Sequence, residues 1–231
     1  MMKIAAFFDV DGTLLNLNTM SSFYWYYCRH CRTNSAFPFK RLFLFANAYL
    51  HYLRLMAKAV KKDERMSVNK TYYARLNGVN EREYKLLVDK WFSGIDQRVS
   101  FNEGVMKCLY KHLESEHIVV LVSGSHMPLI LPYAKKLSIK HVIGTRVEVV
   151  GGCYTGRILN SLPVVGMGKA VAMKEFSKKN KIDLSYSYAY SDHISDSKML
   201  ETVGNPYAVI GDKRLMTYAR LKEWNIIRLS K

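Results

Sequence analysis

Short apolar runs alternate along the chain with longer segments in which apolar residues recur at helical spacing. KIAAFF (3–8) is an apolar run that ends in turn residues, which predicts a buried strand. Similar runs predict further strands at 117–125, 186–192 and 206–211. The alternating sequence RVEVVGGCYTGRI (146–158) predicts a hairpin that turns at its two adjacent glycines.

Helical patterns fill the intervals between these strands. They cover 17–92, 103–116, 129–137 and a segment that starts at the glycine-rich GMGKA (166–170). Alternation of strands and helices favours an α/β fold with a parallel sheet. The segment 17–92 is too long for a simple crossover. We therefore expect a helical cap over 17–92, inserted after the first strand, and a core formed by 1–16 and 93–231.

Composition favours a cytoplasmic protein. Lys3 is followed by only five apolar residues before the first aspartate, which is too short for a signal peptide. No run of about 18 uncharged apolar residues is present, as a membrane span would need. The four cysteines are too few for a disulfide scaffold. Cys28 and Cys31 have CxxC spacing but lack further zinc ligands, so we interpret them as reduced cysteines on a helix.

Polar residues end three of the predicted strands. Asp9 and Asp11 close the first, Ser123 lies at the end of the second, and Asp192 ends the third. Because ligands of parallel α/β sheets bind at the carboxyl ends of the strands, this edge is the candidate site. Two carboxylates this close repel unless a cation lies between them, and Mg²⁺ suits an oxygen-rich site. The alternative is that they only cap the next element.

Three further residues extend this candidate site. Asp196 lies four residues after Asp192, so a helical turn would place both carboxylates on one face. The turn that contains Ser123 and Gly124 can offer a hydroxyl and backbone N–H groups to a phosphate oxygen. Lys169 lies beside a helix start, where a cation is poorly placed unless it faces an anion. Taken alone, a solvated lysine would be the more common case.

Taken together and in order, these residues resemble the motifs of the haloacid dehalogenase-like (HAD) hydrolases, and more narrowly subfamily IB, the phosphoserine-phosphatase-like branch. DVDGT (9–13) resembles the first motif, the serine of VLVSGS the second, Lys169 the third and SDHISD (191–196) the fourth. The resemblance covers nearly the whole chain. It implies a Rossmann-like three-layer core with a parallel sheet and an inserted α-helical cap.

The resemblance also implies a Mg²⁺-dependent phosphomonoesterase. Asp9 would attack phosphorus and form an aspartyl-phosphate, while Asp11 would protonate the leaving group and later take a proton from water. The implied metal ligands are the carboxylates of Asp9 and Asp192 and the backbone carbonyl of Asp11, with Asp196 just behind them. The residues implied to hold the phosphoryl oxygens are Ser123, Gly124 and Lys169.

Two positions depart from the family pattern. His193 stands where the family more often has a small residue, and we interpret it as a tolerated change at the rim of the site. Asn18 stands nine residues after Asp9, where phosphoserine phosphatases tend to carry a glutamate that meets the substrate's ammonium group. A neutral amide binds a cationic amine poorly. Asn18 is therefore a candidate for substrate specificity, and it argues against phosphoserine.

The charge of the predicted cap leaves several partners open. The net charge is +16, and residues 15–92 hold 14 Lys and Arg against 5 Asp and Glu. This basic surface would raise the local concentration of a small organic phosphate, our preferred substrate. The segment Lys40 to Lys62 is aromatic-rich and has no acid. It would also suit peripheral contact with an anionic membrane and a lipid-phosphate phosphatase.

The sequence also bears on nucleic-acid binding and on a role without catalysis. The aromatic run 23–27 is expected to serve cap packing rather than base stacking, which disfavours nucleic acid as a partner. A non-catalytic basic binding module is the alternative from a different class, and the presence of all four motifs disfavours it. The sequence leaves the oligomeric state open.

Overall fold

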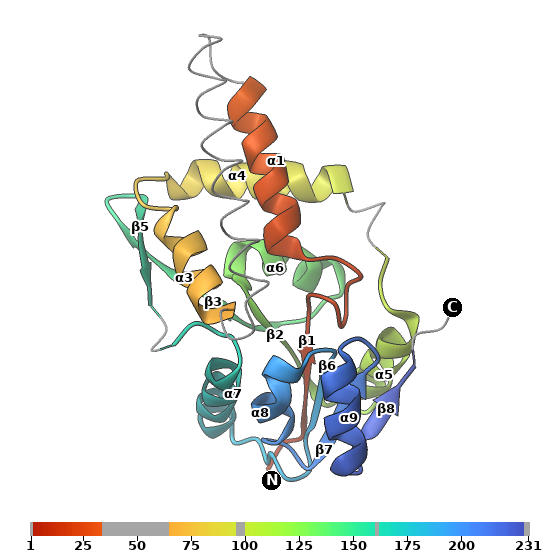
Figure 1. Ribbon diagram of the computed structural model, residues 1–231. Coiled ribbons are helices and arrows are strands. Elements are labelled where there is room, and N and C mark those ends of the chain that lie inside the picture. The colour runs from red at the N-terminus through yellow and green to blue at the C-terminus, as the bar shows by residue number, and fades with distance from the viewer. Residues whose placement is uncertain (1, 34–64, 96–99, 160–161, 229–231) are drawn as a thin grey trace.

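A parallel sheet forms the centre of the molecule, in a computed structural model that describes residues 2–33, 65–95, 100–159 and 162–228. Its strands are β1 (Ala5–Asp9), β2 (Ile118–His126), β3 (His141–Thr145), β6 (Tyr188–Ser191), β7 (Asn205–Val209) and β8 (Asn225–Ile227). They lie in the order β3-β2-β1-β6-β7-β8 with parallel pairing throughout (Figure 1).

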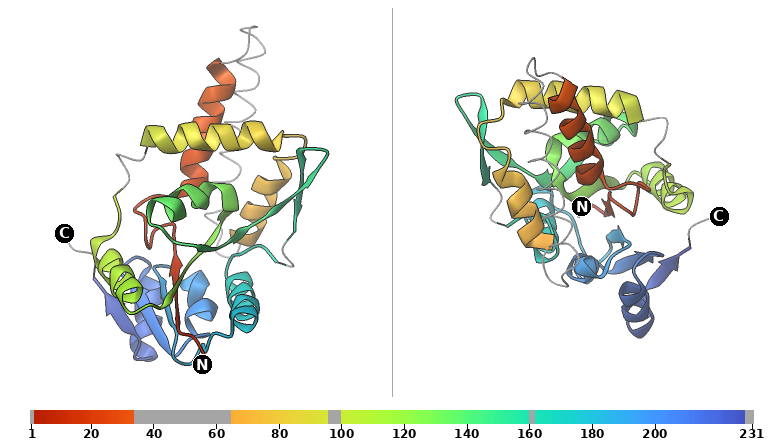
Figure 2. Two further views of the ribbon diagram at one scale, coloured as in Figure 1. Left: turned by 180° about the vertical axis from the view of Figure 1, so that it is seen from behind. Right: turned by 45° about the horizontal axis from the view of Figure 1, so that its top comes forward.

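Helices cover both faces of this sheet (Figure 2). The helices α7 (Met167–Asn180), α8 (Ser197–Leu200) and α9 (Lys213–Leu221) share a core with Ala5 and Phe7 of β1. The helices α5 (Glu103–Glu114) and α6 (Met127–Lys136) share a second core with Ala6 and Phe8. Alternate side chains of β1 thus enter opposite cores, because successive residues of a strand face opposite ways. The predicted three-layer α/β fold is confirmed.

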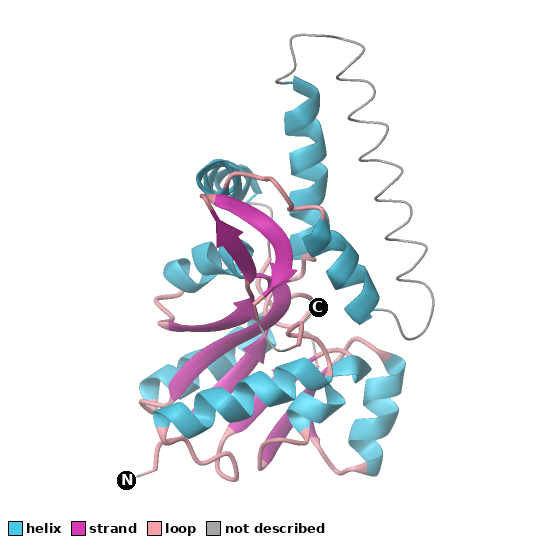
Figure 3. Cartoon of the chain, turned by 90° about the vertical axis from the view of Figure 1, so that its left-hand side faces the viewer, coloured by secondary structure: helices cyan, strands magenta, loops and turns pink. Residues whose placement is uncertain are grey.

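Four described helices lie between β1 and β2 in the chain, α5 and three others. Those three are α1 (Thr19–Thr33), α3 (Arg65–Ala74) and α4 (Glu81–Ile95), and they lie above the carboxyl ends of the central strands (Figures 1 and 3). Phe23 of α1 is 1% exposed, and its ring lies 5.1 Å from that of Tyr84 and 5.6 Å from that of Trp91. The packing role predicted for the aromatic run is confirmed at Phe23.

Two sequence interpretations fall on residues outside the described ranges. The basic segment 40–62, for which membrane contact was considered, is one of them. The interpretation of Cys28 and Cys31 is the second, because the structure describes their backbone in α1 but not their side chains.

The predicted hairpin is present as β4 (Val147–Val150) and β5 (Cys153–Ile158). Sequence analysis assigned it to the core, but backbone hydrogen bonds join it to the loop between α3 and α4. Gly78 N–H donates to the Tyr154 carbonyl and Tyr154 N–H donates to the Val79 carbonyl, each at 2.9 Å. The hairpin therefore continues the wall formed by the helices above the sheet (Figure 3).

Two edge strands were not predicted. β3 has the sequence HVIGT and only its last two residues are fully buried, so it lacks the continuous apolar run that identifies an inner strand. β8 has three residues, Asn225 to Ile227, and none of them is fully buried. The helical pattern predicted over 17–92 is also interrupted, because residues 75–80 form a turn in which Gly78 has a φ of +80°.

Candidate active site

Asp9 is the last residue of β1, an inner strand of the sheet, and its side chain is almost wholly buried. The backbone then turns through Gly12, which has a φ of +86°. A Cβ atom at this position would lie 2.6 Å from Oδ2 of Asp192. Glycine is therefore needed both for the left-handed backbone and for the close approach of the turn to the loop after β6.

Lys169 joins Asp9 to Asp196 inside the protein. Its Nζ atom donates to Oδ1 of Asp9 at 2.5 Å and to Oδ2 of Asp196 at 2.6 Å. All three side chains are at most 7% exposed. Burial opposes the charge of Lys169, but the carboxylates of Asp196 and Asp9 outweigh it and raise the pKa of the lysine. Lys169 lies in the first turn of α7, and its cation faces these two carboxylates instead of solvent.

Asp192 lies on the other side of Asp9 and is reached through Thr13. The Thr13 hydroxyl donates to Oδ1 of Asp192 at 2.7 Å and lies 3.3 Å from Oδ2 of Asp9. The prediction that one helical turn carries Asp192 and Asp196 is wrong. Asp192 precedes the short 3₁₀ helix η2 (Ile194–Asp196), and the two carboxylates have different partners.

The carboxylates of Asp9, Asp192 and Asp196 carry more negative charge than the single cation of Lys169 can balance. Burial, with the neighbouring carboxylates of Asp196 and Asp192, raises the pKa of Asp9 from its ordinary range to about 8, against the opposite effect of Lys169. A divalent cation between Asp9 and Asp192 would relieve this repulsion. The residues thus fit Mg²⁺, which binds through a few carboxylates and keeps its other positions for water or substrate oxygens.

A site of this kind needs few protein side chains. Among the described residues, no cluster of three or more His, Cys, Asp or Glu side chains has the geometry of a complete metal site. The ligand set expected from the sequence uses only the two carboxylates of Asp9 and Asp192 and one backbone carbonyl, that of Asp11. Such a set agrees with the preference of Mg²⁺ for partly hydrated sites in which the substrate supplies oxygens.

Asp11 is held by hydroxyl and amide donors from two elements. Its Oδ2 atom accepts from the hydroxyls of Ser125 at 2.6 Å and Ser123 at 3.2 Å. Its Oδ1 atom accepts from the backbone N–H of Thr19, the first residue of α1, at 2.7 Å. The Thr19 hydroxyl donates in turn to Ser125 at 2.8 Å. Ser123 therefore lies beside Asp11, as the strand-end prediction required.

The second strand differs from expectation in length. β2 continues through Ser123 and Gly124 to His126, and its pairing with β3 shifts register between Ser123 and His126. The residues expected to form a turn thus form an irregular strand end. Sequence reasoning also gave no role to Thr13 and Ser125, whose hydroxyls donate to aspartates, or to Thr19, whose backbone N–H donates to Asp11. Their positions inside or beside the motifs could have identified them as candidates for the site.

Asn18 and His193 have local structural partners. Asn18 is exposed, and its Oδ1 atom accepts from Ser21 N–H at 2.9 Å at the start of α1. His193 Nδ1 accepts from Ser195 N–H at 3.1 Å and so caps η2, and its Nε2 atom lies 3.4 Å from Asp212 Oδ2.

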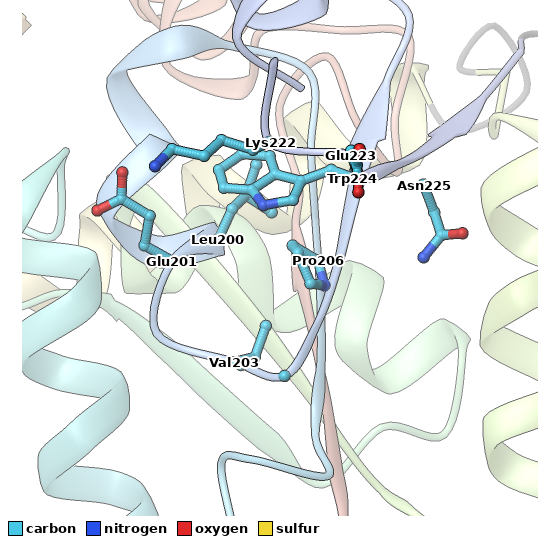
Figure 4. A pocket seen from close by; sticks show the side chains of 9 residues that line it. Leu200, Glu201, Val203, Pro206, Lys222, Glu223, Trp224 and Asn225 are labelled. Carbon is cyan, nitrogen blue, oxygen red and sulfur yellow. The ribbon is translucent and has the colours of Figure 1, made fainter. Parts of the chain in front are cut away.

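The described surface also contains a hollow far from these residues. It lies where β7 and β8 begin, at the opposite edge of the sheet, and its lining includes Glu201, Pro206, Lys222 and Trp224 (Figure 4). It contains none of the predicted site residues. Across the described ranges, each helix is too short or too polar to cross a bilayer.

Comparison with known proteins identifies the family. The family model of the haloacid dehalogenase-like hydrolases matches residues 6–201. This match spans most of the chain and includes Asp9, Asp11, Lys169, Asp192 and Asp196. The chain therefore belongs to the haloacid dehalogenase-like hydrolases.

Relatives extend over nearly the whole chain. The inhibition of morphological differentiation protein of Streptomyces azureus is 29% identical over 228 residues, which cover 97% of this chain and 78% of the relative. The phosphoserine phosphatase SerB1 of Mycobacterium tuberculosis is 29% identical over 224 residues, which cover 96% of this chain and 70% of the relative. Family membership and these relatives together make the protein a phosphatase of the HAD family.

Solved structures share the fold. A Bordetella pertussis protein of unknown function has a TM-score of 0.81 at 24% identity, over 98% of this chain and 99% of that one. The phospho-aspartyl intermediate analogue of a phosphoserine phosphatase has a TM-score of 0.66 at 17% identity, over 100% of this chain and 95% of that one. The sheet order and the helical layers described above are thus those of a phosphoserine-phosphatase-like HAD fold.

Proposed function

We propose that the protein is a Mg²⁺-dependent phosphomonoesterase that acts through an aspartyl-phosphate on Asp9. The observation that carries this proposal is the buried group of Asp9, Lys169 and Asp196, with Asp192 beside it, at the edge of the sheet where ligands bind. Burial of an ion pair is costly, and it contributes little to stability compared with apolar packing. Its place at this edge supports a catalytic use.

The proposed reaction has two steps. An Asp9 carboxylate oxygen attacks phosphorus in line, the bond to the leaving alkoxide breaks, and the alkoxide takes a proton from Asp11. Water then attacks the phosphorus of the aspartyl-phosphate, gives its proton to Asp11, and releases inorganic phosphate and free Asp9. Asp11 accepts three hydrogen bonds that hold its carboxyl group beside Ser123, where it would give the first proton and take the second.

A lysine cation and two hydrogen-bond donors would hold the phosphoryl group. We assign Lys169, the Ser123 hydroxyl and the Gly124 amide to its oxygens. The proposed ligands of Mg²⁺ are Asp9, Asp192 and the backbone carbonyl of Asp11. When bound, the metal supplies positive charge to the phosphoryl oxygens in the transition state. Asp196 holds Lys169 at 2.6 Å and so sets the position of that cation.

A general phosphatase substrate gives the simplest test of this function. The purified protein should hydrolyse p-nitrophenyl phosphate in the presence of Mg²⁺, well above a mock preparation. A protein that folds and binds Mg²⁺ but hydrolyses none of a broad set of phosphomonoesters would contradict the proposal and favour the binding-module alternative.

Metal dependence is the first specific prediction. Chelation by EDTA should abolish activity, Mg²⁺ should restore it, and Ca²⁺ should substitute poorly because it prefers more ligands at longer distances. Mg²⁺ should also raise the melting temperature, and more at pH 8 than at pH 6, since protons compete for a buried Asp9 whose pKa is about 8. Scanning fluorimetry across pH measures this shift.

Variants assign the metal effect to particular residues. Asp192→Ala should remove most of the Mg²⁺-dependent shift and raise the Mg²⁺ concentration needed for half-maximal activity. Asp89→Ala changes an exposed carboxylate on α4 and is the matched control. Full activity in chelator, or an unchanged Mg²⁺ response in Asp192→Ala, would contradict the assignment.

The proposed substrate is a small organic phosphate without an ammonium group. Relatives named phosphoserine phosphatases include SerB1 and SerB2 of Mycobacterium tuberculosis and a Streptococcus thermophilus enzyme. In this chain the Asn18 oxygen already accepts from Ser21 N–H, and its amide nitrogen can only donate. These features support a partner group that accepts hydrogen bonds, rather than a cationic amine.

A single substitution at this position tests the substrate class. Asn18→Asp retains a good helix N-cap and adds one negative charge near the substrate side of α1. We expect unchanged stability and about a fivefold gain in kcat/KM for phosphoserine relative to glycerol phosphate, as an exposed ion pair would give. An unchanged ratio would mean that Asn18 is a helix cap without a role in specificity.

The cap and the cellular setting complete the proposal. We assign 17–92 to the cap that closes over the site, with the β4–β5 hairpin attached to it through Tyr154. The thiols of Cys108 and Cys153 are free, which supports a reducing, cytoplasmic setting. A soluble substrate remains the preferred choice over a membrane lipid, since the described part of the cap packs its aromatic rings inward.

A further inference from the structure

The carbonyl oxygen of Gly124 lies at a meeting point of three donors. The Tyr73 hydroxyl donates to it at 2.5 Å, the Thr145 hydroxyl at 3.0 Å and the Asn69 side-chain amide at 3.2 Å. All three side chains are buried. A carbonyl oxygen has two lone pairs, so this acceptor is saturated. Two of the donors come from α3, a helix that is inserted between β1 and β2 far from Gly124 in the sequence.

Space around Gly124 is equally restricted. A Cβ atom here would lie 2.7 Å from Cγ2 of Val165, 3.2 Å from the Val164 carbonyl and 3.3 Å from Nδ2 of Asn69. A side chain here would clash first with Val165 and would also crowd Asn69 of α3, so glycine lets the backbone fit between these two segments. The contact between α3 and this carbonyl is thus built into the sequence of both segments.

Because the peptide is planar, the hydrogen bonds to the Gly124 carbonyl also affect the orientation of Ser123. The Gly124 carbonyl and the Ser125 N–H belong to one trans peptide, in which the two groups point in opposite directions. With the carbonyl fixed toward α3, the Ser125 N–H points back and donates to the Ser123 hydroxyl oxygen at 3.1 Å. The hydroxyl keeps its own proton for another acceptor, and here it donates to Oδ2 of Asp11 at 3.2 Å.

We propose that Tyr73 and Asn69 are positioning residues, which orient the phosphoryl-binding hydroxyl of Ser123 through the peptide between Gly124 and Ser125. The inference rests on the proposed function of Ser123. Three donors also polarise this peptide and strengthen its N–H as a donor, because hydrogen bonds in series reinforce one another. The helix α3 therefore shapes the phosphoryl site from behind, in addition to covering it.

If these contacts only stabilise the fold, a different result is expected for phosphate affinity. If Tyr73 only ties α3 to the sheet, loss of its hydroxyl should lower the melting temperature and leave the affinity for phosphate unchanged in the folded protein. If it positions Ser123, phosphate affinity should fall in protein that remains folded. Affinity measured by calorimetry on folded protein separates the two.

The test compares Tyr73→Phe with Tyr154→Phe by titration of inorganic phosphate in Mg²⁺ buffer. Tyr154 is a buried tyrosine of the same aromatic group, and its hydroxyl has no hydrogen-bond partner within the described part of the chain. We expect Tyr73→Phe to bind phosphate about tenfold more weakly, as loss of one strong hydrogen bond would give, with a parallel fall in kcat/KM. Tyr154→Phe should match the wild type.

A second variant keeps the test informative if Tyr73→Phe folds poorly. Asn69→Leu removes the longer donor and keeps the volume of the side chain, and it should weaken phosphate binding about threefold. Wild-type phosphate affinity in both folded variants would overturn this inference and leave the proposed function intact. Failure of the wild type itself to bind phosphate or hydrolyse phosphomonoesters would overturn the proposed function, and this inference with it.

Discussion

Replacement of Asp9 by asparagine is expected to reduce phosphomonoester hydrolysis to the level of a mock preparation, a loss of at least about 10⁴-fold. Asparagine keeps the shape of the side chain and can still accept from Val10 N–H and Lys169, which bond to Oδ1 in the wild type. It lacks a carboxylate that can attack phosphorus. Steady-state assays at saturating Mg²⁺ measure the change.

The fold of Asp9→Asn should survive. Because burial raises the pKa of Asp9 to about 8, an ionised carboxylate at this position lowers stability at higher pH, and a neutral isostere avoids that cost. The melting temperature at pH 8 without Mg²⁺ should equal or exceed that of the wild type. Asp89→Asn makes the same chemical change at an exposed site and should leave both properties unchanged. Activity of more than a few per cent in Asp9→Asn would mean that water, rather than Asp9, attacks phosphorus.

The second large effect is expected at Lys169, whose replacement by methionine should impair both activity and stability. Methionine fills a similar volume but leaves Asp9 and Asp196 as buried carboxylates without their shared cation. Breaking a buried ion pair in this way costs about 3–5 kcal/mol of unfolding free energy. Activity should fall at least about 10²-fold, since a charge that stabilises the phosphoryl oxygens is lost. Urea titration and steady-state assays measure the two effects.

The stability loss in Lys169→Met should depend on pH. An aspartate whose pKa is raised in the native state keeps its proton there while the unfolded chain releases it. Stability is then full below the unfolded pKa of about 3.9 and declines as pH rises toward the native pKa. Removal of Lys169 takes away the charge that lowers the pKa of Asp9. The difference from the wild type should therefore be larger at pH 8 than at pH 5.

Two further variants separate the electrostatic cause from lost packing. Lys174→Met changes an exposed lysine on the same helix and should be neutral. The double variant Lys169→Met with Asp196→Asn removes one of the stranded carboxylates and should recover part of the stability without recovering activity. A destabilisation that is the same at pH 5 and pH 8 would contradict the electrostatic account.

Much of this architecture follows from local patterns in the sequence. β1 and the inner part of β2 are continuous apolar runs buried on both faces, so periodicity identified them directly. The edge strand β3 escaped detection because its first three residues are only partly buried, so it lacks a continuous apolar run, and its pairing with β2 is a tertiary property. Asp9, Lys169 and Asp192 were found through motif spacing, and the fold brings them to one edge.

The residues that support the site were beyond sequence reasoning. Tyr73 and Asn69 reach Gly124 across more than 50 positions of the chain, and nothing in their local pattern distinguishes them from ordinary buried residues of a helix. Ser125 and Thr19 were visible beside the motifs, but their hydroxyl bonds depend on the exact positions of β2 and α1. Local patterns place the elements and motifs, whereas such hydrogen bonds arise only when distant elements meet.

The central claim is that Asp9 carries the phosphoryl group during turnover. Wild-type enzyme mixed with excess substrate and quenched in acid within the first turnovers should contain a peptide heavier by one phosphoryl group, with fragmentation that places it on Asp9. Asp9→Asn treated in the same way should show none. A wild-type enzyme that turns over substrate rapidly while Asp9 stays unmodified, or that carries the phosphoryl group on another residue, would contradict the account.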